Sequence, residues 1–285
     1  MAVTRRPQTL NPAILINIGT VAPMSSSAAA AAFGERPDQW PLPEARSPQE
    51  LWLRAVAAGG QGRYAAARAD LAGLIHNESA GRWRSLGRSA YGSFLRQLGW
   101  HWRAHDWDGR ALAAAGTDPG AGADALIGLA ADALGVGRLA TSAALLERAV
   151  GLARNADEPR LEIRLAWVRA ELAMAGGDGP DAMQHARRGV ELAHEALPSL
   201  RRHRVKSDVV LAAALCSAGD LAGSRTVADA ALADTETYQL APLRWALACL
   251  LSDIGSASRS PGDIGEVREL SAQFVTRHGG HWKMR

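Results

Sequence analysis

Short polar turns recur between Ala-rich amphipathic segments, and this recurrence constrains the fold more than any other feature of the sequence. Five such turns begin 32 to 43 residues apart: Gly62–Tyr64, His105–Trp107, Gly137–Leu139, Gly177–Gly179 and Gly219–Leu221. A small residue follows each turn: Ala67, Ala111, Ser142, Ala182 and Ser224. Such a period is typical of solenoids whose repeat unit is an αα-hairpin. One hairpin cannot bury its own apolar face, so we predict that successive hairpins stack on one another.

The composition favours helices over strands. The chain has only 3 Phe and 3 Tyr among its 285 residues, whereas Ala, the best helix former, is abundant. Ser47, Pro48 and Glu50 form the pattern of a helix start, with a capping serine and a proline in the first turn. We therefore predict an all-α fold, a right-handed superhelical solenoid of about five antiparallel αα-hairpins. It would begin at residue 47 and end in a cap built from residues 262–277.

The turn pattern resembles that of the tetratricopeptide repeat (TPR) superfamily. Gly62, Tyr64 and Ala67 are the best match to its turn, and the resemblance extends over residues 47–235. The first-helix Trp of the family is replaced, since Leu51, Phe94 and Leu126 stand in its place, and the period mostly exceeds about 34 residues. The resemblance implies a TPR-like solenoid in which the first helix of each hairpin lines a concave groove that holds a partner's segment.

We predict that residues 1–46 form a disordered N-terminal tail and that residues 47–285 form the solenoid. The Ala-rich stretch before residue 33 has no amphipathic pattern, and Pro37 and Pro41 would break any helix that followed it. Two alternatives are a signal peptide, which the apolar stretch after two N-terminal arginines resembles, and a translation start at Met24. No apolar run reaches the roughly 20 residues needed to cross a bilayer, so we expect no membrane partner.

The charge balance and the cysteines restrict the partner and the compartment. The net charge of +3 is a weak bias, and nucleic-acid binders usually concentrate basic residues on one face, so nucleic acid is not the expected partner. The densest basic run, residues 201–206, is either a patch for phosphate or an acidic partner, or a solvated helix start. Cys216 and Cys249 lie in apolar helical stretches, which is typical of buried free thiols in a reducing cytoplasm.

Two patterns suggest chemistry, and for each we favour a structural interpretation. His101 and His105 stand four residues apart, as two metal ligands on one helix do, but Trp102 stands where the metallopeptidase motif has glutamate. Residues 135–140 match Gly-x-Gly-x-x-Ala, yet a helical pattern precedes them, whereas a dinucleotide-binding fold needs a strand there. We therefore expect no catalytic residue, no metal and no cofactor, and we predict a protein that is not an enzyme.

Several predicted first helices carry two apolar stripes, although a surface helix needs only one. Within residues 161–174, Leu161 and Leu165 belong to one stripe, and Trp167 belongs to the other. The second stripe either packs on a neighbouring hairpin or lines the concave groove. Trp and Arg dominate binding hot spots, so we predict that the following groove side chains contact a partner: Trp52, Trp100, Arg103, Arg164, Trp167, Lys206 and Trp245.

The favoured function is a scaffold or adaptor that binds a protein or peptide partner of unknown identity in this groove. The alternative is a regulatory sensor of a transcription apparatus, which would bind a signalling peptide or a nucleic-acid-associated partner. An attached helix-turn-helix or ATPase domain would mark such a sensor, and the sequence contains neither pattern.

Overall fold

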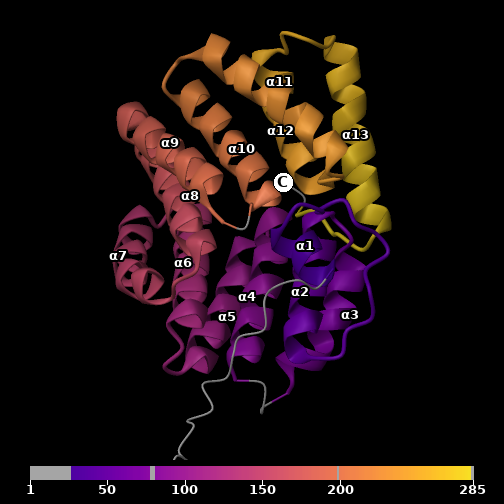
Figure 1. Cartoon of the computed structure of the whole chain (residues 1–285). Coiled ribbons are helices and arrows are strands. Elements are labelled where there is room, and N and C mark those ends of the chain that lie inside the picture. The colour runs from indigo at the N-terminus through magenta and orange to yellow at the C-terminus, as the bar shows by residue number, and fades with distance from the viewer. Residues whose placement is uncertain (1–26, 78–80, 198, 284–285) are drawn as a thin grey trace, which may run out of the picture.

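The computed structural model describes residues 27–77, 81–197 and 199–283. Within these ranges the chain forms thirteen α-helices and no strand, which confirms the predicted all-α class (Figure 1). Helix α1 (Ser27–Phe33) precedes six helical hairpins. The first helices of the hairpins are α2 (Pro48–Gly60), α4 (Arg82–Gln97), α6 (Pro119–Gly135), α8 (Pro159–Gly176), α10 (Arg201–Ser217) and α12 (Ala241–Ile254). The second helices are α3 (Tyr64–Ile75), α5 (His101–Ala115), α7 (Leu139–Asn155), α9 (Gly179–Glu195), α11 (Leu221–Thr237) and α13 (Pro261–Arg277).

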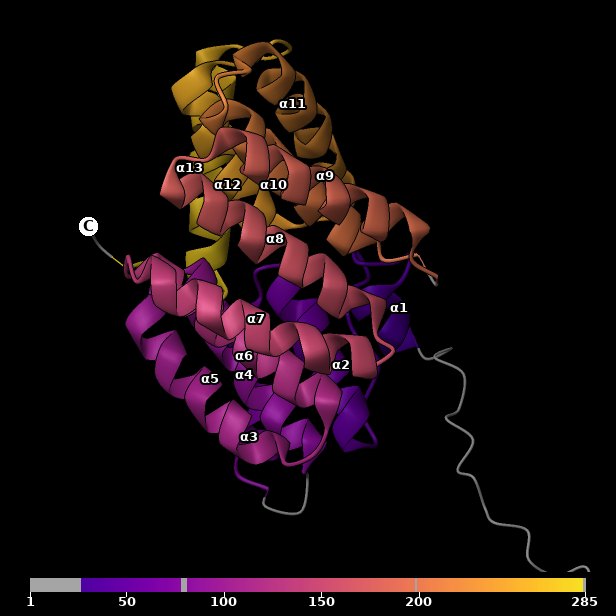
Figure 2. The ribbon, with the colours of Figure 1, turned by 90° about the vertical axis from the view of Figure 1, so that its left-hand side faces the viewer.

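The first helices form the inner layer of the molecule. Each packs against its own second helix and also against the first helix of the next hairpin, so that α2, α4, α6, α8, α10 and α12 follow one another. Each second helix from α3 to α11 also contacts the first helix that follows it. Helix α8 joins the part built from α2 to α7 to the part built from α10 to α13 (Figure 2). The fold is therefore a solenoid of helical hairpins, as the turn pattern predicts.

A glycine in the left-handed conformation ends the first helix of five hairpins. These glycines, with φ between 77° and 87°, are Gly62, Gly99, Gly137, Gly177 and Gly219. After each one, a backbone N–H returns to a carbonyl five residues earlier; the N–H of Arg138, for example, donates to the Ala133 carbonyl at 2.8 Å. This bond is the mark of a Schellman turn, and glycine adopts its positive φ without steric cost. Four of the five predicted turns are thereby confirmed.

The remaining turn differs from the predicted one. Residues 105–107 lie inside α5, and Gly99 forms the turn that precedes this helix. Their polar and aromatic side chains imitate the turn pattern, but none of the three residues is a glycine that could reverse the chain. Ala104, five residues after Gly99, has no exposed surface, like Ala67 and Ser142 at the same distance from their glycines. With Gly99 included, the turns recur more evenly, about every 40 residues.

The segment before residue 47 is ordered where the structure describes it, contrary to the predicted disordered tail. Helix α1 packs on α2 and α10, and four of its alanines are buried. The Gln61 side-chain amide then holds the following segment, because it donates to the Pro37 and Gln39 carbonyls at 2.8 and 2.9 Å. The Ala run has no amphipathic pattern because it is buried on most of its circumference. Residues 1–26, which include the alternative start and the signal-like stretch, lie outside the described residues.

The C-terminal residues join the last hairpin to the first two. The His278 carbonyl accepts a hydrogen bond from the Ala65 N–H at 2.8 Å, and the Lys283 N–H donates to the Leu98 carbonyl at 2.9 Å. The predicted cap is α13, which is the second helix of a sixth hairpin rather than a separate element. The two ends of the solenoid therefore meet. In the described ranges, no helix combines the length and the apolar character that crossing a membrane requires.

Candidate binding cavity

The inner layer lines a partly open cavity of about 390 Å³. All six first helices contribute to its wall, and Phe33 of α1 and His101 of α5 complete it. Because each first helix contacts the next, their inward side chains converge on this space although they lie far apart in the sequence. A volume of this size suits a small organic group or a few side chains of a partner.

One wall of the cavity is aromatic. The Phe33 ring lies 5.2 Å from the Trp52 ring and 5.8 Å from the His203 ring, measured between centroids. His203 in turn stacks on Trp167, with 5.3 Å between centroids and an interplanar angle of 25°. Trp167 is held in place because its Nε1–H donates to the Ser207 hydroxyl at 2.8 Å. These rings offer flat, rigid surfaces against which an apolar group can pack.

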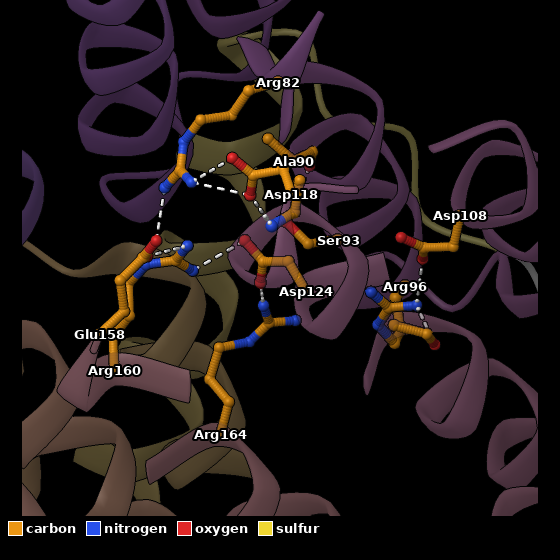
Figure 3. Close-up of polar contacts among 12 residues, drawn as sticks. Arg82, Ala90, Ser93, Arg96, Asp108, Asp118, Asp124, Glu158, Arg160 and Arg164 are labelled. Carbon is orange, nitrogen blue, oxygen red and sulfur yellow. Dashed lines mark hydrogen bonds and ion pairs between the residues drawn. The ribbon is translucent and has the colours of Figure 1, made fainter. Parts of the chain in front are cut away.

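A network of ion pairs lies beside these rings, with the Arg160 guanidinium 5.6 Å from the Phe33 ring and 5.4 Å from the Trp52 ring (Figure 3). Arg160 and Arg164 stand one turn apart on α8 and both pair with Asp124 of α6, with 2.7 Å between Arg160 Nη1 and Asp124 Oδ2. Glu158 joins the network, since it pairs with Arg160 at 2.6 Å and also with Arg82 of α4. The carboxylates are thus shared among several guanidinium groups, and each neutralises its partners only in part.

A second network lies beside the first and joins α4, α5 and α6. Arg96 Nη1 donates to Asp108 Oδ2 and to the Gly128 carbonyl, each at 3.0 Å, and also pairs with Asp132. Burial raises the pKa of the Asp108 carboxyl, against the opposing effect of Arg96, and the neighbouring Asp132 raises it further. Gly128 leaves room for this carboxyl, because a Cβ there would come within 2.5 Å of it.

Helix α10 contributes the remaining cationic side chains. Lys206 pairs with Glu171 at 3.3 Å, whereas Arg202 donates to the Val56 carbonyl at 3.1 Å and has no carboxylate partner among the described residues. Burial, together with the charges of Arg202, Arg160 and Arg164, holds the pKa of His203 well below its ordinary value. His203 is therefore a neutral ring in a surrounding of positive potential.

Four of the seven predicted groove residues meet in this cavity. Trp52, Arg164, Trp167 and Lys206 come from three helices and all line it. They are brought together by the stacking of α2, α8 and α10 around the inner space.

The other three predicted groove residues lie elsewhere, so their assignment to the groove is corrected. Trp100 donates through Nε1 to the His281 carbonyl at 2.7 Å, and Trp245 packs on Trp282 with 4.2 Å between ring centroids. Both therefore hold the C-terminal segment. The Arg103 guanidinium lies on the outer side over the Trp100 ring, 4.5 Å from its centroid. For Trp100 and Arg103, the sequence prediction missed this outcome because it placed the turn at residues 105–107, whereas α5 already begins at His101.

The most buried polar residues of the site were not predicted. A usable signal is nevertheless present in the sequence, because several of the ion pairs join residues 36 positions apart. These pairs are Arg82–Asp118, Arg96–Asp132 and Asp124–Arg160. An acidic and a basic residue one repeat apart occupy equivalent places on adjacent inner helices, so charge pairs at the repeat period mark the inner face.

The structure shows where the residues of the two patterns that suggested metal or nucleotide chemistry lie. His101 lines the cavity, whereas His105 is exposed on α5. No group of three or more metal-binding side chains occurs among the residues that the structure describes. Gly135 ends helix α6, so a helix and not a strand precedes the Gly-x-Gly-x-x-Ala pattern.

Comparison with known proteins adds no relative to this description. No protein-family model matches the chain, and no curated protein matches it either. The chemistry of the cavity follows from its own residues, which combine aromatic rings with buried cationic groups.

Proposed function

We propose that the protein is a non-enzymatic interaction module of the TPR-like kind, which binds a segment of a protein or peptide partner at the inner face of its solenoid. One observation carries this proposal: Trp52, Arg164, Trp167 and Lys206 converge on a single cavity lined by the first helices. Rigid aromatic rings and arginines are the side chains that most often supply binding energy at interfaces.

Helix α1 supports the proposal because it occupies part of the same inner surface. It packs on α2 and α10, which belong to the first and fifth hairpins, and it places Phe33 in the cavity wall. The inner layer thus already accommodates a short helix with small side chains and one aromatic anchor. A partner's segment of similar character would use the same surfaces.

The two cysteines support a cytoplasmic location. Cys216 is a free thiol, and Cys216 and Cys249 do not form a disulfide with each other. Free thiols persist in a reducing compartment, so we place this interaction module in the cytoplasm.

The proposal is tested by selecting peptides from a random twelve-residue phage library on the immobilised full chain. We expect a shared motif to be enriched, and the peptides to bind Trp167→Ala at least about tenfold more weakly than the wild type. Trp102→Ala is the matched control, because Trp102 lies outside the cavity and is 53% exposed.

Thermal melting of the same variants separates binding from folding. Trp167→Ala should keep a melting temperature well above that of Leu165→Ala, which removes a buried core side chain. Two results contradict the proposal: the selection enriches no motif, or Trp167→Ala melts as low as Leu165→Ala and Trp167 is only part of the core.

A further inference from the structure

The acidic and basic groups around the cavity are equal in number but unevenly paired. Asp108 and Asp132 offset Arg96, and Glu171 offsets Lys206. Asp118, Asp124 and Glu158 are shared among three guanidinium groups, those of Arg82, Arg160 and Arg164. Arg202 has no carboxylate partner within the described part of the chain. Two carboxyls thus gather at Arg96, and Arg202 is the cation of this set that is left without a carboxylate.

Building on the function proposed above, we propose that Arg164, Arg202 and Lys206 form a site for one anionic group, a carboxylate or a phosphate, carried on an apolar body that packs against Trp52 and Trp167. The anionic group would complete the hydrogen bonding of Arg202 and share the charge of Arg164. The aromatic wall would hold the rest of the ligand.

The hydrogen bonding of Arg202 supports this assignment. A guanidinium carries five N–H donors, and the structure gives Arg202 one acceptor, the Val56 carbonyl. Its side chain lines the cavity, and its other donors have no acceptor among the described residues. A partly buried cation with unused donors is costly, and an anion within hydrogen-bond distance relieves that cost.

The position of Arg202 in its helix adds a second argument. Arg202 lies in the first turn of α10, which contains no acidic residue. The N-terminus of a helix carries a partial positive charge, so basic residues there are disfavoured and an anion is favoured. The basic side chains of residues 201–206 also point in different directions, as an anion site on one face of α10 requires. Arg202 and Lys206 face the cavity, whereas Arg204 faces outward and donates to the Ala193 carbonyl of α9 at 3.1 Å.

The neighbouring titratable groups are consistent with an unmet need for negative charge. Burial and the charge of Arg96 lower the pKa of Arg164 to about 10. Burial also lowers the pKa of Arg202. Each of these guanidinium groups is destabilised in its charged form, and a bound anion would reverse that effect.

The test measures binding of small aromatic probes to the full chain by isothermal titration calorimetry at low salt. Phenylacetate and phenyl phosphate carry the proposed anion, and phenylacetamide is a neutral molecule of nearly the same shape. We expect at least one of the two anions to bind about tenfold or more tightly than the amide, because hydrogen bonds to charged groups are the stronger ones.

Arg202→Gln is the decisive variant, since it removes the charge while keeping a donor for the Val56 carbonyl and leaves no carboxylate without its partner. It should weaken anion binding at least about tenfold. Arg204→Gln is the matched control, with the same charge change on the same helix but outside the cavity, and it should bind the anion as the wild type does. The melting temperature of both variants verifies that they are folded.

Three results would overturn the anion site: neither anion binds the wild type, phenylacetamide binds as tightly as the anions, or Arg202→Gln binds them without loss. The source of the anion is resolved with the selected peptides, in which an acidic residue is replaced by its amide. A loss that appears in the wild type but not in Arg202→Gln places the anion on a partner peptide. Free anions that bind while no peptide motif is enriched would keep the site and refute the segment-binding function. Selected peptides whose binding depends on Trp167 but not on Arg202 would keep the segment-binding function and refute the anion site.

Discussion

Replacing Phe33 by Ala should detach α1 from the solenoid without unfolding it. The Phe33 side chain is only 7% exposed and contacts the rings of Trp52 and His203. Beyond this ring, the charged contact that holds α1 and its flanking residues is the exposed pair between Glu35 and Arg201, and exposed pairs contribute little. Phe33 is therefore the main anchor of this helix.

The magnitude follows from the surroundings of the ring. Truncation of a buried Phe to Ala costs about 3–5 kcal/mol, and the lower end applies here because the ring already borders an open cavity. Helix α1 is the first helix that the structure describes, and it contacts only α2 and α10 extensively. The loss of about 3 kcal/mol should therefore fall on the local opening of α1 and reduce amide protection there about a hundredfold.

Hydrogen exchange followed by mass spectrometry tests this expectation on the peptide that covers residues 27–40. The matched variant is Leu247→Ala in α12, whose side chain is fully buried in the core, so its cost should lower the global melting temperature by several degrees. Phe33→Ala should instead leave the melting temperature nearly unchanged. The reasoning is refuted if α1 keeps its protection in Phe33→Ala while the melting temperature falls as far as in Leu247→Ala.

Three further predictions concern the turns, the closure and the buried carboxyl. Gly137→Ala should destabilise by about 1–3 kcal/mol in urea unfolding, because its φ is 78°, whereas Gly151→Ala inside α7 should stabilise by up to about 1 kcal/mol; equal effects would contradict this. Trp282→Ala removes the contact with Trp245 and should raise hydrogen exchange in residues 278–283 and in the turns of the first two hairpins, which these residues contact. Unchanged exchange in both places would contradict the packing of the C-terminal segment. Burial raises the pKa of Asp108 to about 7, above its ordinary 3.8, so the folded protein binds this proton more tightly. The unfolding free energy of the wild type relative to Asp108→Asn should therefore increase as the pH falls from about 7 towards 4, and a parallel pH dependence of the two proteins would contradict the assignment.

The turns could be predicted from the sequence because their chemistry is local. A glycine after an apolar helix, followed by a small residue five positions later, marks the Schellman turns at Gly62, Gly137 and Gly219. The turn at Gly99 was misplaced because residues 105–107 carry the same kinds of side chain. Gly99 and Ala104 have the same spacing as Gly62 and Ala67, and the backbone hydrogen bond from Trp100 to Leu95 shows that the turn is there.

Helix α1 and the cavity could not be predicted in this way because both depend on contacts between distant residues. The Ala run becomes a stable helix only against α2 and α10, and the latter begins more than 160 residues later. Arg160 and Arg202 lie one helical turn before the predicted groove residues Arg164 and Lys206, but the sequence does not show which partners they meet. Both point inward because the inner layer supplies Asp124 to one of them and the Val56 carbonyl to the other.

The closure of the solenoid determines what the cavity can bind. In an open solenoid the concave face is a long groove that an extended peptide can follow. Here Gly62 lies against Val275 and Pro242, so that a Cβ on Gly62 would come within 3.1 Å and 3.3 Å of their side chains, and the last hairpin covers the turn of the first. Helix α1 covers another part of the same face. A ligand of the size of one aromatic group with an anionic end fits the space that remains, whereas a longer segment must displace α1. Phe33→Ala should therefore tighten the binding of selected peptides while leaving phenylacetate binding dependent on Arg202.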